Sequence, residues 1–114
     1  MGNKNGKKEP KFHGETETID LGTKKIGEEF SIYIRTNDSC GEWYRVINEN
    51  EFKEYIEYVH HNSQYHGMLD QIGASTSNNL YFKGIKIGNT CIKIYKTFQG
   101  CVEKLEIYKI CIIE

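Results

Sequence analysis

Apolar and polar residues alternate along most of the chain, in short runs separated by turn residues. The clearest run is 28–35, in which Phe30, Ile32 and Ile34 are separated by single, more polar positions. A period of two is typical of a half-buried strand. Comparable runs predict further strands at 16–21, 42–48, 52–59, around Leu80 and Phe82, at 90–96 and at 102–113. Short strands with Gly and Asn turns between them predict an all-β sandwich of about seven strands.

The segment 52–59 admits two interpretations. Its apolar residues recur at helical spacing, at Phe52, Tyr55, Ile56 and Val59. However, the segment is short and rich in Tyr, Ile and Val, which favour strands. We interpret it as a strand, and one or two helical turns remain the alternative.

Polar stretches predict the connections between the strands. We expect loops at 36–41, 60–72, 73–79 and 97–101, and a turn at Gly88–Asn89. Consecutive strands of a sandwich run back and forth, so alternate connections lie at the same end. The loops 36–41, 73–79 and 97–101 are therefore expected to cluster, and clustered loops on a rigid scaffold commonly carry binding function.

The first 14 residues are polar and rich in Gly and Lys. Without apolar periodicity they cannot bury enough surface to offset the entropy of ordering. We expect residues 1–14 to be a disordered tail and residues 15–114 to form one sandwich domain, since 114 residues suffice for a single core.

Charge and cysteine usage narrow the range of partners and compartments. The net charge of −1 argues against nucleic acid or an anionic membrane as the main partner. No apolar run is long enough to span a membrane, and the N-terminus lacks the apolar centre of a secretory signal. We therefore expect a cytoplasmic protein whose four cysteines, none in a Cys-x-x-Cys pair, are free thiols. Export would allow one or two disulfides, and the sequence leaves their pairing open.

The sequence gives little support for a metal site or for a catalytic nucleophile. His60, His61 and His66 share one polar stretch, but adjacent side chains rarely converge on one ion, and no Cys or carboxylate stands at ligand spacing. Cys40 beside Gly41 could be a thiol nucleophile, but no recognisable motif places an acid or base for it. We predict no metal, no cofactor and no enzyme activity.

Three loops carry short motifs along the chain. They hold, in order, Asn37, Asp38, Ser39, Cys40 and Gly41 before Trp43, then Gly73, Ala74, Ser75 and Thr76, then Thr97 and Phe98. These loops resemble, in the same order, those of the chagasin-like inhibitors of papain-type cysteine proteases. That family carries an Asn-Pro-Thr-Thr-Gly loop followed by aromatic residues, then a Gly-x-Gly-Gly loop, and an Arg-Pro-Trp or Arg-Pro-Phe loop near the end. The resemblance covers about residues 16–113.

The motifs match in part. Asn37 and Gly41 agree with the first motif, and the three residues between them differ from it. Gly73 keeps only the first glycine of the second motif. The third loop lacks the Arg-Pro pair, and Phe98 stands for the aromatic residue of that motif. These departures bear on affinity and protease range more than on the fold.

The resemblance implies an immunoglobulin-like sandwich that inhibits papain-family proteases reversibly, as a monomer, by placing three loops in the active-site cleft. All the loop residues named above are the implied protease-binding residues. Trp43 is either a further contact or the core Trp of the sandwich. Cys40 is either a small filler, like the Thr it replaces, or a thiol within reach of the protease's own thiol. The alternative function is an immunoglobulin-like interaction module with a non-protease partner.

Overall fold

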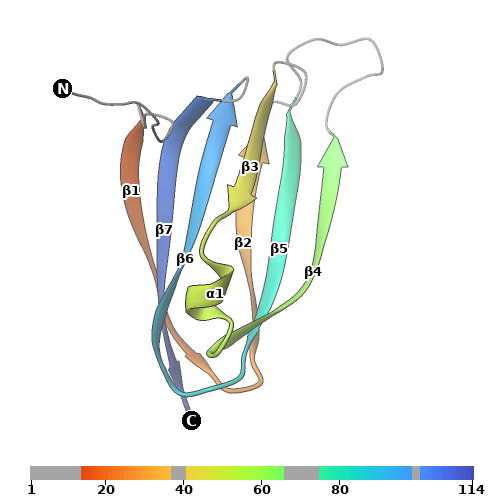
Figure 1. Ribbon diagram of the computed structural model, residues 1–114. Helices are drawn as coiled ribbons and strands as arrows, with labels where there is room; N and C mark the ends of the chain where they lie inside the picture. Colours follow the sequence, from red (N-terminus) through yellow and green to blue (C-terminus); the bar gives the residue numbers. More distant parts are fainter. Residues whose placement is uncertain (1–13, 37–40, 66–74, 99–100) are drawn as a thin grey trace, which may run out of the picture.

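The computed structural model describes residues 14–36, 41–65, 75–98 and 101–114, which form two packed sheets (Figure 1). The elements are β1 (Glu15–Lys25), β2 (Glu29–Thr36), β3 (Glu42–Val46), α1 (Glu49–Phe52), β4 (Ile56–Tyr65), β5 (Thr76–Gly84), β6 (Gly88–Phe98) and β7 (Cys101–Ile113). The predicted all-β, immunoglobulin-like sandwich is confirmed. The predicted tail lies, apart from Gly14, outside the described residues.

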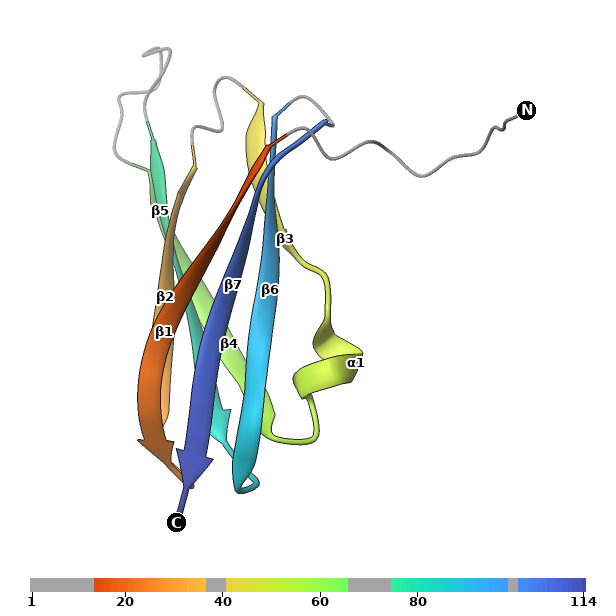
Figure 2. The same cartoon turned by 90° about the vertical axis from the view of Figure 1, so that its left-hand side faces the viewer.

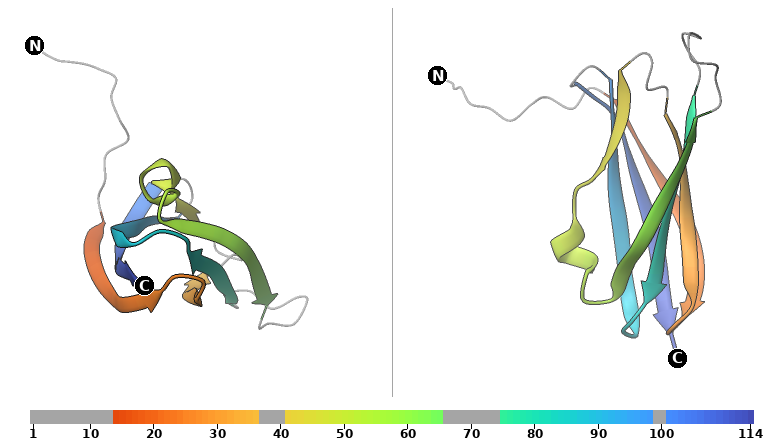
Figure 3. Two further views of the ribbon diagram at one scale, coloured as in Figure 1. Left: turned by 90° about the horizontal axis from the view of Figure 1, so that it is seen from below. Right: turned by 90° about the vertical axis from the view of Figure 1, so that its right-hand side faces the viewer.

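One sheet has the strand order β1-β7-β6-β3, and the other has the order β2-β5-β4. β1 runs parallel to β7, and the remaining pairs are antiparallel. Figures 2 and 3 show the two layers from the sides and from below. Each sheet ends in two edge strands, so β3 and β4 are both edges, and they are joined in sequence through α1.

The core lies between the sheets and follows the alternation seen in the sequence. Its buried apolar residues are Phe30, Ile32, Ile34, Phe52, Ile56, Leu80, Phe82, Ile92, Ile94, Tyr108, Ile110 and Ile112. The ring of Phe82 is central: it stacks on Phe30 with 5.8 Å between centroids and meets Phe52 edge-on at 5.9 Å. Aromatic contacts of these geometries add to area burial, so β2, β5 and α1 are held at one point.

The strand interpretation of 52–59 is confirmed from Ile56 onward, where β4 begins, and the single helical turn α1 lies before it and ends at Phe52. Asn48 explains the short helix. Its Nδ2 donates to the carbonyl of Cys91 at 3.0 Å, and its Oδ1 accepts the N–H of Lys93 at 2.8 Å. The Asn48 side chain therefore pairs with the edge of β6 where β3 has ended, and the backbone after it is free to coil. Among the described residues no helix is long and apolar enough to cross a membrane.

Two predicted loops are partly wrong. The loop expected at 60–72 begins too early, because β4 continues to Tyr65 and pairs with β5 along its length. The loop expected at 73–79 ends too late, because β5 already begins at Thr76. Both segments are polar on the inward face as well as the outward face, so the apolar alternation that reveals a strand is absent from them.

The third loop and the last turn also need correction. Thr97 and Phe98 belong to β6, and Cys101 opens β7, so the loop expected at 97–101 is largely strand. The turn expected at Gly88–Asn89 lies instead at residues 85–87, because Gly88 and Asn89 already pair with β7.

Candidate functional site

Three connections between strands begin and finish at one end of the sandwich, called the loop end below. Thr36 pairs with Thr76, which pairs with Tyr65 in turn. In the other sheet Glu42 pairs with Phe98, where β7 also starts. In Figure 1 the ends of β2, β4 and β6 and the starts of β3, β5 and β7 all lie at the top. The chain segments that follow β2, β4 and β6 therefore depart from neighbouring points.

The residues predicted to bind a protease fall into two groups. Those in the described part of the chain are Gly41, Ser75, Thr76, Thr97 and Phe98. The others, Asn37, Asp38, Ser39, Cys40, Gly73 and Ala74, lie outside the described residues. The strands that flank this second group belong to the described residues. The structure of the loop end is therefore defined by the contacts that hold these strand ends in place.

The described members differ in accessibility. Gly41 is exposed and has φ 87, a left-handed conformation in which a side chain would be strained, directly before β3. The Oγ of Ser75 accepts a hydrogen bond from Nε of Arg35 at 2.7 Å, which ties the start of β5 to the outer face of β2. Thr76 is 6% exposed, so its side chain faces the interior. Phe98 is half-buried at the end of β6.

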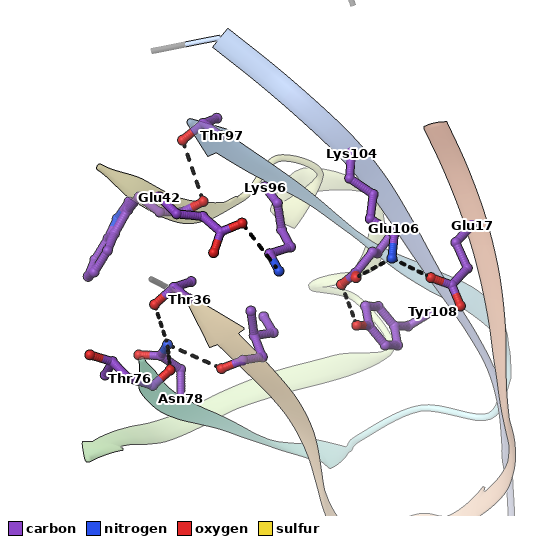
Figure 4. Close-up of polar contacts among 12 residues, drawn as sticks. Glu17, Thr36, Glu42, Thr76, Asn78, Lys96, Thr97, Lys104, Glu106 and Tyr108 are labelled. Carbon is purple, nitrogen blue, oxygen red and sulfur yellow. Dashed lines mark hydrogen bonds and ion pairs between the residues drawn. The ribbon is translucent and has the colours of Figure 1, made fainter. Parts of the chain in front are cut away.

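Beneath the loop end, the fully buried side chain of Asn78 joins the three strands of one sheet (Figure 4). Its Nδ2 lies 3.2 Å from the carbonyl of Ile34, 3.2 Å from Oγ1 of Thr36 and 3.4 Å from the carbonyl of Thr76. Its Oδ1 accepts from Oγ of Ser63 at 2.8 Å. One amide thereby fixes the ends of β2, β4 and β5, from which two of the three connections depart.

The facing sheet is also polar on its inner side near the loop end. Lys104 of β7 contacts Glu17 of β1 at 2.6 Å and Glu106 at 3.4 Å. Lys96 of β6 contacts Glu42 of β3 at 3.7 Å. These pairs reach across β1-β7-β6-β3 and point toward the layer that holds Asn78 (Figure 4). The interior of the sandwich is therefore apolar in one half and polar in the half under the loop end.

Glu106 and Tyr108 mark the boundary between these two halves. Glu106 is 9% exposed and accepts a hydrogen bond from the Tyr108 hydroxyl at 2.5 Å. Burial, followed by this hydrogen bond, raises the pKa of Tyr108 far above its usual range. The sequence analysis did not single out Asn78 or Glu106. A signal was present, because Asn78 stands two positions before Leu80 and Glu106 two before Tyr108, which places both on an inward face.

Trp43 is not the core Trp of the sandwich. It is 53% exposed, on the outer face of β3 beside the loop end, and it stacks on Tyr44 with 5.3 Å between ring centroids. Its carbonyl accepts a hydrogen bond from Oγ1 of Thr97 at 3.4 Å. Of the two roles left open by the sequence, the core role is excluded, and a large aromatic surface is available next to the predicted binding loops.

The described residues offer no arrangement suited to metal or thiol chemistry. No three His, Cys, Asp or Glu side chains gather among them in a way that could hold an ion. His60 stacks on Tyr81 at 4.5 Å, and Nδ1 of His61 lies 2.8 Å from the Tyr58 hydroxyl. Cys91 is a free thiol, and burial, with the nearby Glu51 carboxylate, raises its pKa. A raised pKa disfavours the reactive thiolate.

Comparison with known proteins adds a fold assignment. No family model matches the sequence, and no curated protein matches it. The cysteine protease inhibitor EhICP2 from Entamoeba histolytica is 16% identical, with a TM-score of 0.64 over 89% of this chain and 98% of that chain. PbICP-C, solved in complex with falcipain-2, is 16% identical, with a TM-score of 0.61 over 99% of this chain and 96% of that chain.

A third similar structure is the solution structure of amebosin, which is 13% identical, with a TM-score of 0.55 over 89% of this chain and 99% of that chain. At these identities the likeness establishes the fold. The resemblance to the chagasin-like inhibitors is thus confirmed at the level of the fold.

Proposed function

We propose that this chain, which shares the fold of the cysteine protease inhibitor EhICP2, is a reversible inhibitor of papain-family cysteine proteases. The observation that supports this most directly is the common departure point of three connections at one end of a rigid sandwich. These connections and the strand ends beside them carry the sequence positions that resemble the inhibitor motifs. PbICP-C, of the same fold, was solved in complex with falcipain-2.

The mechanism we propose is occlusion of the protease cleft without cleavage. An inhibitor of this kind must fill the cleft while keeping its backbone out of the geometry in which the catalytic thiolate attacks. Small side chains such as Ser39 and Cys40 allow close approach, and Gly41 permits the tight return into β3. Loops on a rigid support lose little entropy on docking, so more of the contact energy appears as affinity.

The proposed contact residues are those predicted from the sequence, with Trp43 added. Trp43 and Phe98 flank the loop end and are of the residue types that dominate binding energy at protein interfaces. Asn78 supports the surface from within by holding the ends of β2, β4 and β5. We propose that one monomer engages one protease.

The test is inhibition of papain and a cathepsin L-type protease by the purified chain, with trypsin as the control enzyme of another class. The expected result is reversible, concentration-dependent inhibition of both cysteine proteases and none of trypsin. Inhibition should be lost in a chain whose residues 37–40 are replaced by Gly-Ser-Gly-Ser, which keeps the length of the connection between β2 of one sheet and β3 of the other. If the folded chain inhibits neither cysteine protease, the proposal is wrong and an interaction module with another partner is the better description.

A further inference from the structure

A second surface lies on the side of the sandwich where the two sheets part, between the edge strands β3 and β4 (Figure 3, right). A pocket of about 340 Å³ opens there. Its floor is formed by Phe52, Leu80 and Phe82, each at most 3% exposed. This volume falls within the range of pockets that take a large side chain or a small ligand.

The rim of the pocket is polar. Tyr58 from β4 is 46% exposed, and its ring meets Phe82 edge-on at 5.8 Å. The Tyr58 hydroxyl and His61 are hydrogen-bonded to each other, and Glu49 of α1 also lines the pocket. Glu49 is the sole carboxylate among the described lining residues, which include neither Lys nor Arg. The pocket therefore favours an apolar group with positive charge beside it.

The strand next to the pocket is an edge whose run 60–64 lacks the usual protection. β4 is the last strand of its sheet, and in the described part of the chain it pairs on one side only, with β5. Natural edges are commonly blocked by Lys, Pro, a bulge or a covering segment. The bulge of β4 lies between Tyr58 and His60, and the run 60–64 beyond it contains neither Lys nor Pro. A regular row of backbone donors and acceptors is therefore available beside an apolar pocket.

We propose that the β4 edge and this pocket form a second binding site, which takes an extended peptide segment of a partner protein by strand addition. The segment extends the three-stranded sheet beyond β4, and one large apolar side chain fills the pocket. Because side chains of a strand alternate between faces, residues two positions from that side chain face the same way, and a basic residue there approaches Glu49. This site lies on the side of the sandwich, and the proposal does not rest on the proposed protease inhibition.

A second copy of this chain fits the site less well. If two copies paired through the run 60–64 of β4, the inward residues of the added run would be His61 and Ser63. Neither supplies a large apolar group, so the floor of Phe52, Leu80 and Phe82 would stay unfilled. A heterologous segment satisfies both the backbone edge and the pocket.

The test uses acetylated, amidated peptides of the sequence Thr-Lys-Thr-X-Thr-Lys-Thr, with X as Phe, Leu, Trp or Ser, titrated into the ¹⁵N-labelled chain. At least one of the Phe, Leu and Trp peptides should shift the β4 amides, slow their hydrogen exchange, and bind roughly 10-fold or more tightly than the Ser peptide. The peptide is then N-methylated either at X or at the next residue. Adjacent amides of a strand point in opposite directions, so one methylation should abolish binding and the other should leave it within about threefold.

Protein variants provide matched controls. Val46→Trp places an indole in the pocket from β3, whereas Arg45→Trp places the same group on the opposite, exposed face of that strand. Binding should be lost in the first and kept in the second. The proposal is overturned if none of the apolar peptides binds the wild-type chain at about 1 mM, or if the Ser peptide binds equally well. It is also overturned if both N-methylated peptides bind, which would indicate a pocket for small apolar molecules, or if the chain alone dimerises through β4.

Discussion

Replacing Asn78 by alanine should lower the free energy of unfolding by about 3 kcal/mol. The amide is fully buried and carries two hydrogens, which three acceptors share, and its oxygen accepts one further bond. That amounts to about three hydrogen bonds at a net value of about 1 kcal/mol each. The exposed Ser63 hydroxyl can turn to water after the change, whereas the buried Thr36 hydroxyl has no such access.

Urea unfolding followed by circular dichroism measures this loss. With a slope of about 1–3 kcal/mol per M for a small domain, the midpoint should fall by about 1–3 M. Asn62→Ala is the matched control, because Asn62 is exposed on β4, and its effect should stay within about 0.5 kcal/mol. A loss below about 1 kcal/mol, or one equal to that of the control, would refute the view that Asn78 ties β2, β4 and β5 together.

Three further outcomes are expected. Asn37→Ala should weaken protease inhibition through loss of loop preorganisation, and Phe98→Ala should weaken it by about 1–3 kcal/mol; unchanged inhibition constants for both would contradict the wedge mechanism. Deleting residues 1–14 should leave the thermal midpoint within about 2 °C, as measured by calorimetry. Because the folded-state pKa of Tyr108 is raised, its contribution is present below the unfolded pKa of about 10 and is lost as the pH rises beyond it. The urea midpoint should therefore fall less between about pH 8 and about pH 10.5 in Tyr108→Phe than in the wild type, and an equal fall would contradict this assignment.

The sandwich could be predicted because its apolar half obeys a local rule. In β2, Phe30, Ile32 and Ile34 alternate with exposed residues, and the same period recurs at Ile92 and Ile94 of β6. Strand order along the chain then determines which connections share an end. The clustering of strand ends around the three candidate loops follows from these two facts, without knowledge of any single contact.

The parts of the fold that the sequence did not predict depend on contacts that a local pattern cannot reveal. The polar run of β4 after Val59 looks like a loop because its inward residues are polar: Ser63 bonds Asn78, and His61 bonds the Tyr58 hydroxyl. The helical turn α1 depends on Asn48, whose side chain binds β6 across more than 40 positions of sequence. In both cases a polar side chain hydrogen-bonds to another strand, so no apolar alternation marks the element in the sequence.

Polar groups under the loop end have a cost, since burying them contributes less to stability than an apolar core of the same size. Directional hydrogen bonds, however, fix the relative positions of strand ends more narrowly than apolar contacts, which tolerate sliding. Asn78 in one sheet and the pair Lys96–Glu42 in the other lie where a binding surface needs such precision. The apolar half, with Phe82 at its centre, supplies the stability that this arrangement requires.

Trp43 allows binding and folding to be separated in one experiment. Its side chain is 53% exposed, so Trp43→Ala removes little buried surface and should cost at most about 1 kcal/mol, chiefly the stacking on Tyr44. If Trp43 becomes buried against a protease, the same change should weaken inhibition by about 2 kcal/mol or more, roughly 30-fold. Ile87→Ala is the control, because Ile87 is 52% exposed in the β5–β6 turn at the opposite end. A Trp43→Ala chain that inhibits as well as Ile87→Ala would show that the exposed indole has no part in the contact. A loss of stability of over about 2 kcal/mol would show that binding and folding are not separable at this position.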